Sequence, residues 1–514
     1  MTGYEYDALD RLTRVTYADT STVAYVHDAG DRLREIIDSS AGTITREYDL
    51  LDRLTSETTP EGSLSYTYDL DGRRETMTVA GQPTVTYAYD DGHRLTSITQ
   101  GPSVVSMTYD AADRRETLTL PNGIVTTYDY DDADQLTGLT YTLGETTLGT
   151  LTYTYDAVGN RTSVGGTWAR TGLPQPVASA TYDAANRIET WAGRTFSYDA
   201  NGNLASDGLT SYLWNARDQL TTVFGPYYAT FQYDGVGRRT TRSFSGLSTS
   251  SLYDGPNAVR EISGDNSSAE ILPGLAVDEW FTRSDAAGFT HLLGDALGST
   301  VALVDAAGLK KTEYTYAPFG VVTTSGASSA NPTAFTGREM DPTGLHHYRN
   351  RDYNPRLQRF LAEDPAEFDS GDANLYAYVW NSPTNWIDPY GLVPMLKPPG
   401  CRGVNRKDPW WKRVFCSPEF QELLLTMAAG GRFGGKGPRW GRSPTGRTRG
   451  ASSRPKWKST DALRQHNRMA RDAAREAGLN QDQAQRLHRE ISGLDLNYQD
   501  ILDIARSIRG GSNP

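Results

Sequence analysis

Two histidines stand out among the residues of this 514-residue chain that could perform acid–base chemistry near neutral pH. His466 and His488 lie in an arginine-rich stretch that also contains Arg489, Glu490 and Tyr498. A histidine pair, or a histidine with a glutamate, can cleave RNA without a metal. One group removes the 2′-hydroxyl proton, another protonates the leaving oxygen, and an arginine stabilises the phosphorane. A histidine on an amphipathic helix is more often structural, so these five residues are a candidate nuclease site only.

Several aspartates precede a proline, and among them Asp364 and Asp388 form a second group of candidates, while Asp341 shows the same local pattern without an assigned role. Two carboxylates held close together cannot both ionise, so one keeps a proton and the pair titrates as a unit. Such a pair supplies an acid and a base at once. An isolated Asp-Pro-x-Gly segment more often caps a turn. The chain shows no Cys-His metal spacing, no Gly-rich phosphate loop and no serine triad, so we predict no metal and no cofactor.

The elements that would position the histidines are three short helices within residues 459–514. Cap signals open them near Thr460, Asn480 and Asn497, and Gly478 and Gly493 end the first two. His466 then lies on the first helix and His488 on the second. The apolar residues that these helices would bury are Leu463, Ala470, Ala474, Ala477, Ala484, Leu487, Ile491, Ile501, Leu502, Ala505 and Ile508.

Residues 393–458 form a basic segment rich in Gly, Pro and Trp, which is either a linker or the start of the same C-terminal unit. Tryptophans interleaved with cations suit phosphate contacts and base stacking. Eight glycines between Gly430 and Gly450 favour a flexible linker instead. The only cysteines, Cys401 and Cys416, provide no disulfide framework.

The charge of the chain is divided unequally along its length. From Lys397 onward there are 23 Lys/Arg against 11 Asp/Glu, a net +12, whereas the preceding residues carry 28 against 52, a net −24. A basic tail suits nucleic acid as a partner, and an acidic body could hold this tail as its own cargo. No apolar run approaches the roughly 18 residues of a membrane span, so we predict none.

A short repeat dominates residues 1–290. A Tyr-Asp dipeptide recurs mostly at intervals near 20 residues, with degenerate copies at Tyr25–Asp28 and Tyr212–Asn215. Each unit reads as a strand, a tight turn and a second strand, and stacked units could bury a face that one hairpin cannot. The sequence therefore predicts a mainly β fold. The aspartates of the intact copies are Asp7, Asp49, Asp69, Asp90, Asp110, Asp131, Asp156, Asp183, Asp199, Asp234 and Asp254.

This spacing resembles the YD repeats of Rhs and teneurin-like proteins, and residues 291–392 look like the Rhs-associated core. The segments that carry this second resemblance are His291–Ser299, Val304–Gly308, Tyr314–Gly320, Phe335–Arg338, Gly344–Pro355, Arg359–Pro365, Asn374–Tyr378 and Pro383–Leu392. The resemblance implies a sheet of β-hairpins that spirals into a hollow shell, followed by a variable toxin. The small C-terminal domain would be mostly α.

The resemblance also implies an intramolecular aspartyl protease in the core. Carried over by motif, Asp364 and Asp388 are the acid/base pair, Arg351 is a supporting cation, and the chain is cut near Leu392. One position departs from the family pattern, because Glu367 stands where the first Asp-Pro element usually has Gly.

The family further implies interbacterial competition. A bacterium would deliver the protein by secretion or from its surface, the toxin would act in the target-cell cytoplasm, and a cognate immunity protein would protect the producer. We expect the toxin to be a nuclease, with RNA favoured over DNA. Three alternatives stay open: a non-catalytic helix-turn-helix module on DNA, a cell-surface adhesion or structural repeat protein, and another toxin chemistry such as ADP-ribosylation.

Overall fold

The structure is a computed structural model that describes residues 2–174 and 176–395. It also describes eight separate residues further on, all in helical conformation: Ala477, Gln483, Leu487, Gln499, Ile501, Leu502, Arg506 and Arg509. In the two long ranges nearly all regular structure is antiparallel β-strand. This confirms the mainly β fold that the repeat predicts.

The first sheet has sixteen strands, and each strand pairs with its neighbours in the sequence. Alternating residues are buried along most strands between β2 and β15, as expected where one face of a sheet is covered. Its strands are β1 (Gly3–Tyr6), β2 (Leu12–Thr16), β3 (Thr22–His27), β4 (Leu33–Asp38), β5 (Gly42–Tyr48), β6 (Leu54–Thr59), β7 (Gly62–Tyr68), β8 (Arg74–Val79), β9 (Val85–Tyr89), β10 (Leu95–Gln100), β11 (Ser103–Tyr109), β12 (Arg115–Thr119), β13 (Ile124–Tyr130), β14 (Leu136–Leu143), β15 (Thr146–Tyr155) and β16 (Arg161–Gly165).

The chain then forms a three-stranded sheet and a fourteen-stranded sheet, again in sequence order. The larger of these continues past residue 290 to Gly326, so it includes the start of the core motif. The strands are β17 (Ala180–Tyr182), β18 (Ile188–Trp191), β19 (Arg194–Thr195), β20 (Ser197–Tyr198), β21 (Leu204–Ser206), β22 (Ser211–Trp214), β23 (Leu220–Phe224), β24 (Tyr228–Tyr233), β25 (Arg239–Phe244), β26 (Leu247–Asp254), β27 (Asn257–Ser263), β28 (Ser268–Pro273), β29 (Trp280–Asp285), β30 (Gly288–Gly294), β31 (Thr300–Asp305), β32 (Lys310–Tyr316) and β33 (Val322–Gly326).

Residues 335–395 contain only short elements, which build a compact central segment. It has a four-stranded sheet and three single-turn 3₁₀ helices. These elements are η1 (Phe335–Gly337), β34 (Glu339–Met340), β35 (His346–Tyr348), β36 (Arg351–Asn354), β37 (Arg359–Phe360), η2 (Glu367–Ser370) and η3 (Val379–Asn381).

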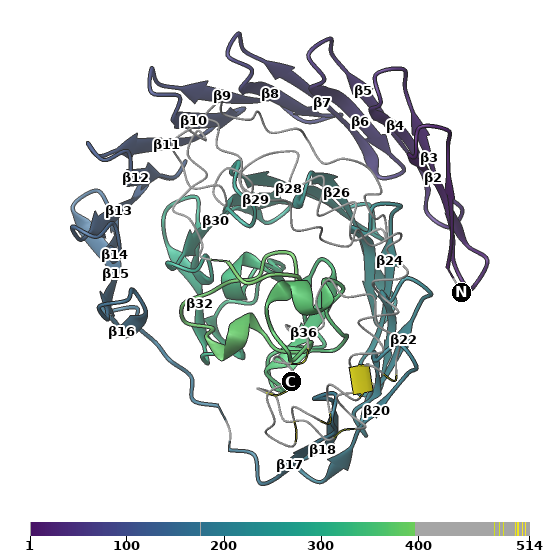
Figure 1. The fold of residues 1–514 in the computed structure, drawn as a ribbon. Helices are drawn as coiled ribbons and strands as arrows, with labels where there is room; N and C mark the ends of the chain where they lie inside the picture. Colours follow the sequence, from purple (N-terminus) through teal and green to yellow (C-terminus); the bar gives the residue numbers. More distant parts are fainter. Residues whose placement is uncertain are drawn as a thin grey trace, which may run out of the picture.

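Together the sheets wind as a spiral. Figure 1 shows β2 to β16 as an outer arc, β17 to β24 closing the turn, and β26 to β32 passing inside the arc. The central segment, drawn in green, lies inside this inner layer. The spiral that the YD-repeat resemblance implies is therefore confirmed.

The two layers are joined by an apolar core and by buried ion pairs. Val105 and Ile98 of the outer sheet, both fully buried, belong to one cluster with Val259 and Phe281 of the inner sheet. Arg238 of the inner layer contacts Glu57 of the outer layer at 2.8 Å.

The pKa of Glu57 shows how strongly the neighbouring arginines stabilise its buried charge. Burial alone would raise its pKa, but Arg238 and Arg46 lower the pKa of Glu57 to about 2. Arg217–Asp38 and Arg115–Glu279 join the layers in the same way, at 2.5 and 2.7 Å. Losing one partner of such a pair would leave a buried charge uncompensated.

Most Tyr-Asp turns are closed by their own aspartate, whereas Asp254 instead accepts the side chains of Tyr66 and Arg74 from the outer layer. In one unit, Asp69 Oδ1 accepts the backbone N–H groups of Asp71 and Arg73, and Asp69 Oδ2 accepts the Arg73 side chain at 2.6 Å. Gly72 has φ +82°, the left-handed conformation that this turn requires. The same aspartate–arginine pair, four residues apart, closes the turns at Asp7, Asp28, Asp49, Asp90, Asp110, Asp183 and Asp234.

The tyrosine links each unit to the preceding one. The Tyr89 hydroxyl donates to the Arg74 carbonyl at 2.9 Å, while the guanidinium of Arg73 lies 4.7 Å from the centre of the Tyr89 ring. The degenerate copy keeps this arrangement, since Trp214 Nε1 donates to the Leu204 carbonyl and Asn215 caps its turn. Other tyrosines whose hydroxyls donate to a backbone carbonyl of the preceding unit are Tyr48, Tyr68, Tyr109, Tyr130, Tyr155, Tyr233 and Tyr253.

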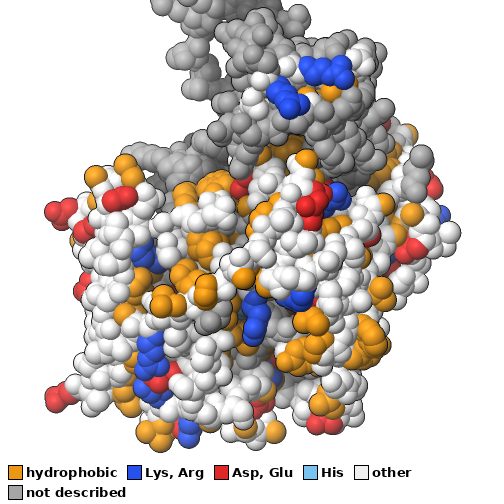
Figure 2. All heavy atoms as spheres, turned by 90° about the horizontal axis from the view of Figure 1, so that it is seen from below, with side chains coloured by type: hydrophobic (Ala, Val, Ile, Leu, Met, Phe, Trp, Pro, Cys, Tyr) orange, Lys and Arg blue, Asp and Glu red, His pale blue; other side chains and the backbone are white. Residues whose placement is uncertain are grey.

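In most units the turn positions between aspartate and arginine face solvent, whereas Gly235 and Val236 of the Asp234 turn are buried. Leu9, Leu50, Leu51, Leu70 and Val158 lie one or two residues after a turn aspartate, and each is exposed by two-thirds or more. On the face shown in Figure 2, apolar side chains are likewise spread among charged ones. Outside the Asp234 turn, packing thus constrains the tyrosine, the aspartate and the arginine, and leaves the residues between them free to vary.

The eight helical residues near the C-terminus agree with single positions of the predicted helices. Ala477, Leu487, Ile501 and Leu502 are buried, and Arg509 donates to the Ala477 carbonyl at 2.7 Å. The helical domain as a whole stays a prediction, and Cys401 and Cys416 lie outside the described residues. Within the described residues, no helix has the length and apolar character needed to cross a membrane.

The turn geometry predicts the effect of removing one aspartate. Asp110→Ala leaves the N–H groups of Ala112 and Arg114 without their acceptor, so urea unfolding should show a loss of about 1 kcal/mol. Asp110→Asn should lose less, because Asn215 fills the same role in its own turn. Asp132→Asn, an exposed turn residue, is the control. Equal losses for Ala and Asn would show that the cap does not matter.

Candidate active site

The candidate residues are positioned by the central segment. Arg351 begins β36, directly after the tight turn that joins β35 to β36. Asp364 follows β37, and its N–H donates to the Leu375 carbonyl. Asp388 lies in the last described segment, where Ile387 and Met395 pair through two backbone hydrogen bonds of 2.9 and 2.7 Å. Three stretches that are distant in the sequence therefore meet at one place.

Arg351 is at the centre of this site. Its Nη2 lies 2.9 Å from Asp364 Oδ2 and 3.3 Å from Asp388 Oδ2. Its Nη1 donates to the Leu375 carbonyl, and its guanidinium lies 3.7 Å from the centre of the Phe360 ring. The three residues that the resemblance implies are thus in direct contact.

Burial sets the protonation of this pair. Arg351, Asp364 and Asp388 are 3, 5 and 1% exposed. Burial raises the pKa of Asp364 to about 7, with the neighbouring Asp388 adding to the effect and Arg351 opposing it. Burial also raises the pKa of Asp388 against the effect of Arg351. Because one guanidinium offsets only one negative charge, the pair retains one proton below about pH 7.

Asp388 also contacts the peptide at which the resemblance implies a cut. Its Oδ1 accepts the N–H of Leu392 at 2.9 Å and the N–H of Val393 at 3.2 Å. The second of these is the amide nitrogen of the Leu392–Val393 bond. The same carboxyl group therefore faces Arg351 with one oxygen and this amide with the other.

The turn at Asp364 forms although Glu367 replaces glycine. Glu367 has φ +51°, and its N–H donates to the Asp364 carbonyl at 2.9 Å. The N–H of Ala366 donates to Asp364 Oδ1 at 2.8 Å. A left-handed glutamate is costlier than glycine, but the hydrogen bonds of the turn are complete.

Gly391 is required by close packing. It has φ +65°, and a Cβ atom at this position would lie 2.5 Å from the Tyr348 carbonyl oxygen and 3.2 Å from the Arg351 nitrogen. No other residue would fit without moving the β35–β36 turn, so the glycine next to the expected cut has a steric role.

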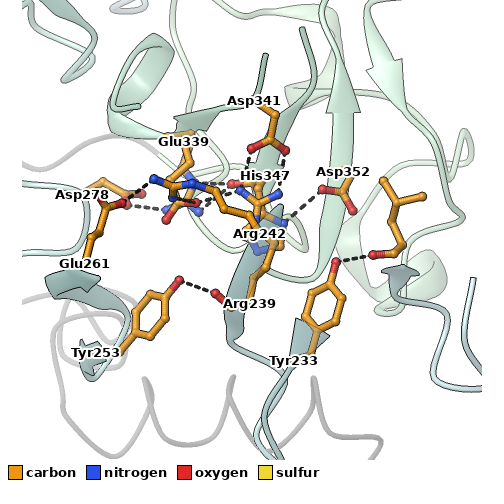
Figure 3. Close-up of polar contacts among 12 residues, drawn as sticks. Tyr233, Arg239, Arg242, Tyr253, Glu261, Asp278, Glu339, Asp341, His347 and Asp352 are labelled. Atoms are coloured by element: carbon orange, nitrogen blue, oxygen red, sulfur yellow. Dashed lines mark hydrogen bonds and ion pairs between the residues drawn. The ribbon is translucent and has the colours of Figure 1, made fainter. Parts of the chain in front are cut away.

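Sequence reasoning missed a buried ionic network that fixes the central segment to the inner sheet. Figure 3 shows Arg239 and Arg242 of β25 facing acidic residues of the central segment. Arg239 binds Asp341 through two hydrogen bonds of 2.6 and 2.9 Å, and also contacts Glu339. Asp341, in the first of the Asp-Pro elements, thus anchors the segment besides closing a turn. The only signal in the sequence was a set of charges that resembles a solvated surface.

The predicted nuclease residues His466, His488, Arg489, Glu490 and Tyr498 lie outside the described residues. Within residues 2–174 and 176–395 and the eight helical positions, no group of three or more His, Cys, Asp or Glu side chains could hold a metal ion.

An antiparallel spiral built on Tyr-Asp turns, with a buried carboxylate pair in its central segment, defines a YD-repeat shell. The chain belongs to the teneurin YD-shell family, whose model matches residues 125–383, and the RHS Repeat model matches residues 6–44, 27–64 and 48–84. The resemblance to YD-repeat, Rhs-type proteins is thereby confirmed as family membership.

Three comparisons illustrate the relationship. The tRNA3(Ser)-specific nuclease WapA of Bacillus spizizenii is 33% identical over 261 residues, which cover 46% of this chain and 11% of that protein. Double-stranded DNA deaminase toxin A of Burkholderia cenocepacia is 28% identical over 258 residues, or 41% of this chain and 18% of that protein. The crystal structure of TcdB2-TccC3 superposes with a TM-score of 0.55 at 18% identity, over 76% of this chain and 28% of that one.

These matches differ in what they establish. The alignments span only about a tenth to a fifth of the length of the two curated relatives. The likeness to TcdB2-TccC3 shows the fold alone, because the sequence identity is low.

Proposed function

We propose that this chain is the C-terminal part of an Rhs-type toxin that cuts itself after Leu392, or within a residue or two, and so frees the segment from Val393 onward. The observation that carries the proposal is the position of Asp388. One of its oxygens accepts the Val393 N–H, and the other shares Arg351 Nη2 with Asp364. One carboxyl group thus contacts the amide of this peptide bond, and Arg351 joins that group to a second carboxyl group.

The order of proton transfers follows from these contacts. Asp388 accepts two N–H groups, which favours its ionised form, so Asp364 holds the shared proton. Ionised Asp388 takes a proton from water, whose oxygen attacks the Leu392 carbonyl carbon while Asp364 protonates the carbonyl oxygen. Asp388 then passes its proton to the Val393 nitrogen, the C–N bond breaks, and Asp364 regains its proton from the gem-diol. A carboxylic acid and an amine result, and Arg351 offsets the negative charge of the pair throughout.

The first test is the loss of cleavage on neutralising either carboxyl group. The wild-type chain should run on a denaturing gel as two fragments that meet at Leu392 and Val393, whereas Asp388→Asn and Asp364→Asn should remain whole. Asp305→Asn, in a turn where asparagine can replace aspartate as the cap, should cut like the wild type. An uncut wild type, or equal cutting in wild type and Asp388→Asn, contradicts the proposal.

The second test is the pH dependence of the reaction. A raised pKa means that Asp364 is protonated below about pH 7 and loses its proton above it. Because the mechanism needs this proton, the first-order rate of cleavage should be about tenfold lower at pH 8 than at pH 6. Pulse-labelled chain from cell-free synthesis, shifted to each pH, gives this rate. A rate that rises across the range would exclude Asp364 as the acid.

For the released segment we propose a nuclease, with RNA as the favoured substrate. Support comes from its net charge of +12 and from a relative named as a tRNA nuclease, while the relative named as a DNA deaminase shows that such toxins differ in chemistry. The proposal includes delivery from a bacterium into the cytoplasm of a target cell and protection of the producer by a cognate immunity protein. His466, His488, Glu490, Arg489 and Tyr498 are the residues proposed to act.

Incubation of the released segment with total RNA and with plasmid, with and without EDTA, tests this assignment. RNA should be degraded in both conditions, and His488→Ala or His466→Ala should abolish the degradation. Intact RNA and DNA would remove the nuclease, and a gel shift without cleavage would favour the helix-turn-helix module. Activity that survives both alanine variants would instead refute the choice of residues.

A further inference from the structure

The tight turn after β35 contacts the residues that precede the expected cut, and each of its side chains binds a different backbone carbonyl. We propose that Arg349 and Asn350 are positioning residues for self-cleavage, and that Asp278 fixes Arg349 in place. Asp278 belongs to the shell wall, by which we mean the fourteen-stranded sheet β20–β33 and its loops. Cleavage would then require a central segment that is docked on the wall. The inference rests on the proposed self-cleavage and adds to it the requirement for a folded shell.

Three consecutive side chains bind three consecutive carbonyls. Arg349 Nη1 donates to the Pro389 carbonyl at 2.5 Å, and Asn350 Nδ2 donates to the Tyr390 carbonyl at 2.9 Å. Arg351 Nε donates to the Gly391 carbonyl at 2.5 Å. The next carbonyl along the chain belongs to Leu392, whose bond to Val393 is the expected cut. The backbone carbonyls of Pro389, Tyr390 and Gly391, which precede this bond, are therefore each fixed by a hydrogen bond.

The backbone conformation of the turn makes this correspondence possible. Arg349 has φ +57°, and the Asn350 N–H donates to the Tyr348 carbonyl at 2.6 Å. Gly391 packs so closely on this carbonyl that a Cβ atom would be only 2.5 Å away. The β35–β36 turn and residues 389–391 therefore cannot slide along each other. The side chains of the turn thus fix which carbonyl of residues 389–391 each of them binds.

Asp278 ties this turn to the wall. It lies in the loop between β28 and β29, and its side chain is 1% exposed. Asp278 Oδ1 lies 2.7 Å from Arg349 Nη2, and Asp278 Oδ2 lies 3.1 Å from Arg349 Nη1. The carbonyl of Pro256, also in the wall, accepts Arg349 Nη2 at 3.0 Å. Arg349 thus joins two acceptors of the inner layer to the carbonyl of Pro389.

The geometry has a direct consequence for the reaction. A displacement of about 1 Å at a reacting centre can cost about a hundredfold in rate. If the central segment is not seated on the wall, Arg349 lacks Asp278 and Pro256, and the Pro389–Gly391 stretch loses a fixed position. The cut is therefore coupled to completion of the shell around the central segment.

A matched pair of variants tests the inference in the full-length chain. Arg338 Nη1 binds the same Asp278 Oδ1 at 2.6 Å, but its other hydrogen bonds go to the His347 carbonyl. Arg338→Met and Arg349→Met both remove one cation from Asp278, and only the second loses the contact with Pro389. We expect Arg349→Met to slow cleavage about a hundredfold and Arg338→Met less than about threefold, with similar melting temperatures.

Two further variants separate positioning from a general loss of structure. Arg349→Lys keeps a cation for Asp278 and a donor for Pro389, and should restore most of the rate. Asn350→Leu removes the side-chain hydrogen bond to the Tyr390 carbonyl at a half-buried position without changing charge and leaves only the longer one of 3.3 Å from the backbone N–H, so it should slow cleavage about tenfold at an unchanged melting temperature. The pH at which the rate is half-maximal should stay the same in both, because neither residue contacts Asp364 or Asp388.

The outcomes distinguish this inference from the proposed function. If Asp388→Asn stays whole while Arg349→Met and Asn350→Leu cut like the wild type, the positioning role is wrong and self-cleavage stands. Equal slowing by Arg338→Met and Arg349→Met would likewise overturn it. If Asp388→Asn still cuts, the proposed function itself fails.

Discussion

The junction between successive Tyr-Asp units is the interaction on which the shell depends. One aspartate accepts two N–H groups and an arginine of its own turn, and that arginine lies over the tyrosine of the next unit. The tyrosine hydroxyl returns to a carbonyl of the preceding unit. The junction supplies register along the sheet edge, so the strands between need only alternate apolar and polar residues. Long sheets in strict sequence order follow from it.

The repeat made most of the fold predictable, but not all of it. The counted spacing located the hairpins, including the degenerate one at Trp214 and Asn215. It missed the turns at Asp295 and Asp305, which have the same aspartate cap without a preceding tyrosine. The contact between the layers also could not be predicted from the repeat, because it joins residues such as Glu57 and Arg238 that are 181 positions apart. Charged residues on strands are ordinarily expected at a surface, and here they are buried between two sheets.

The candidate site was predictable where a motif named its residues. Asp364, Asp388 and Arg351 meet as the family resemblance implies, although the resemblance alone gave no reason for Gly391 or for the tolerance of Glu367. Arg349 and Asn350 were not predicted, because they recognise backbone carbonyls, and a carbonyl has no signature in the sequence. Their role depends on a left-handed turn and on the closeness of two backbone segments, which only the three-dimensional arrangement reveals.

The spiral also has a consequence for how the protein is made. The apolar face of the outer sheet is covered by strands that follow about 180 residues later, as the separation of Arg74 and Asp254 shows. At a synthesis rate of about 5–20 residues per second, that face stays uncovered on the ribosome for roughly 10–40 seconds before its partner layer is made. Each new hairpin can pair at once with the one before it, so the sheet grows during translation while its inner face stays uncovered. A chain of this kind should therefore be most prone to aggregation, and most dependent on chaperones, midway through its own synthesis.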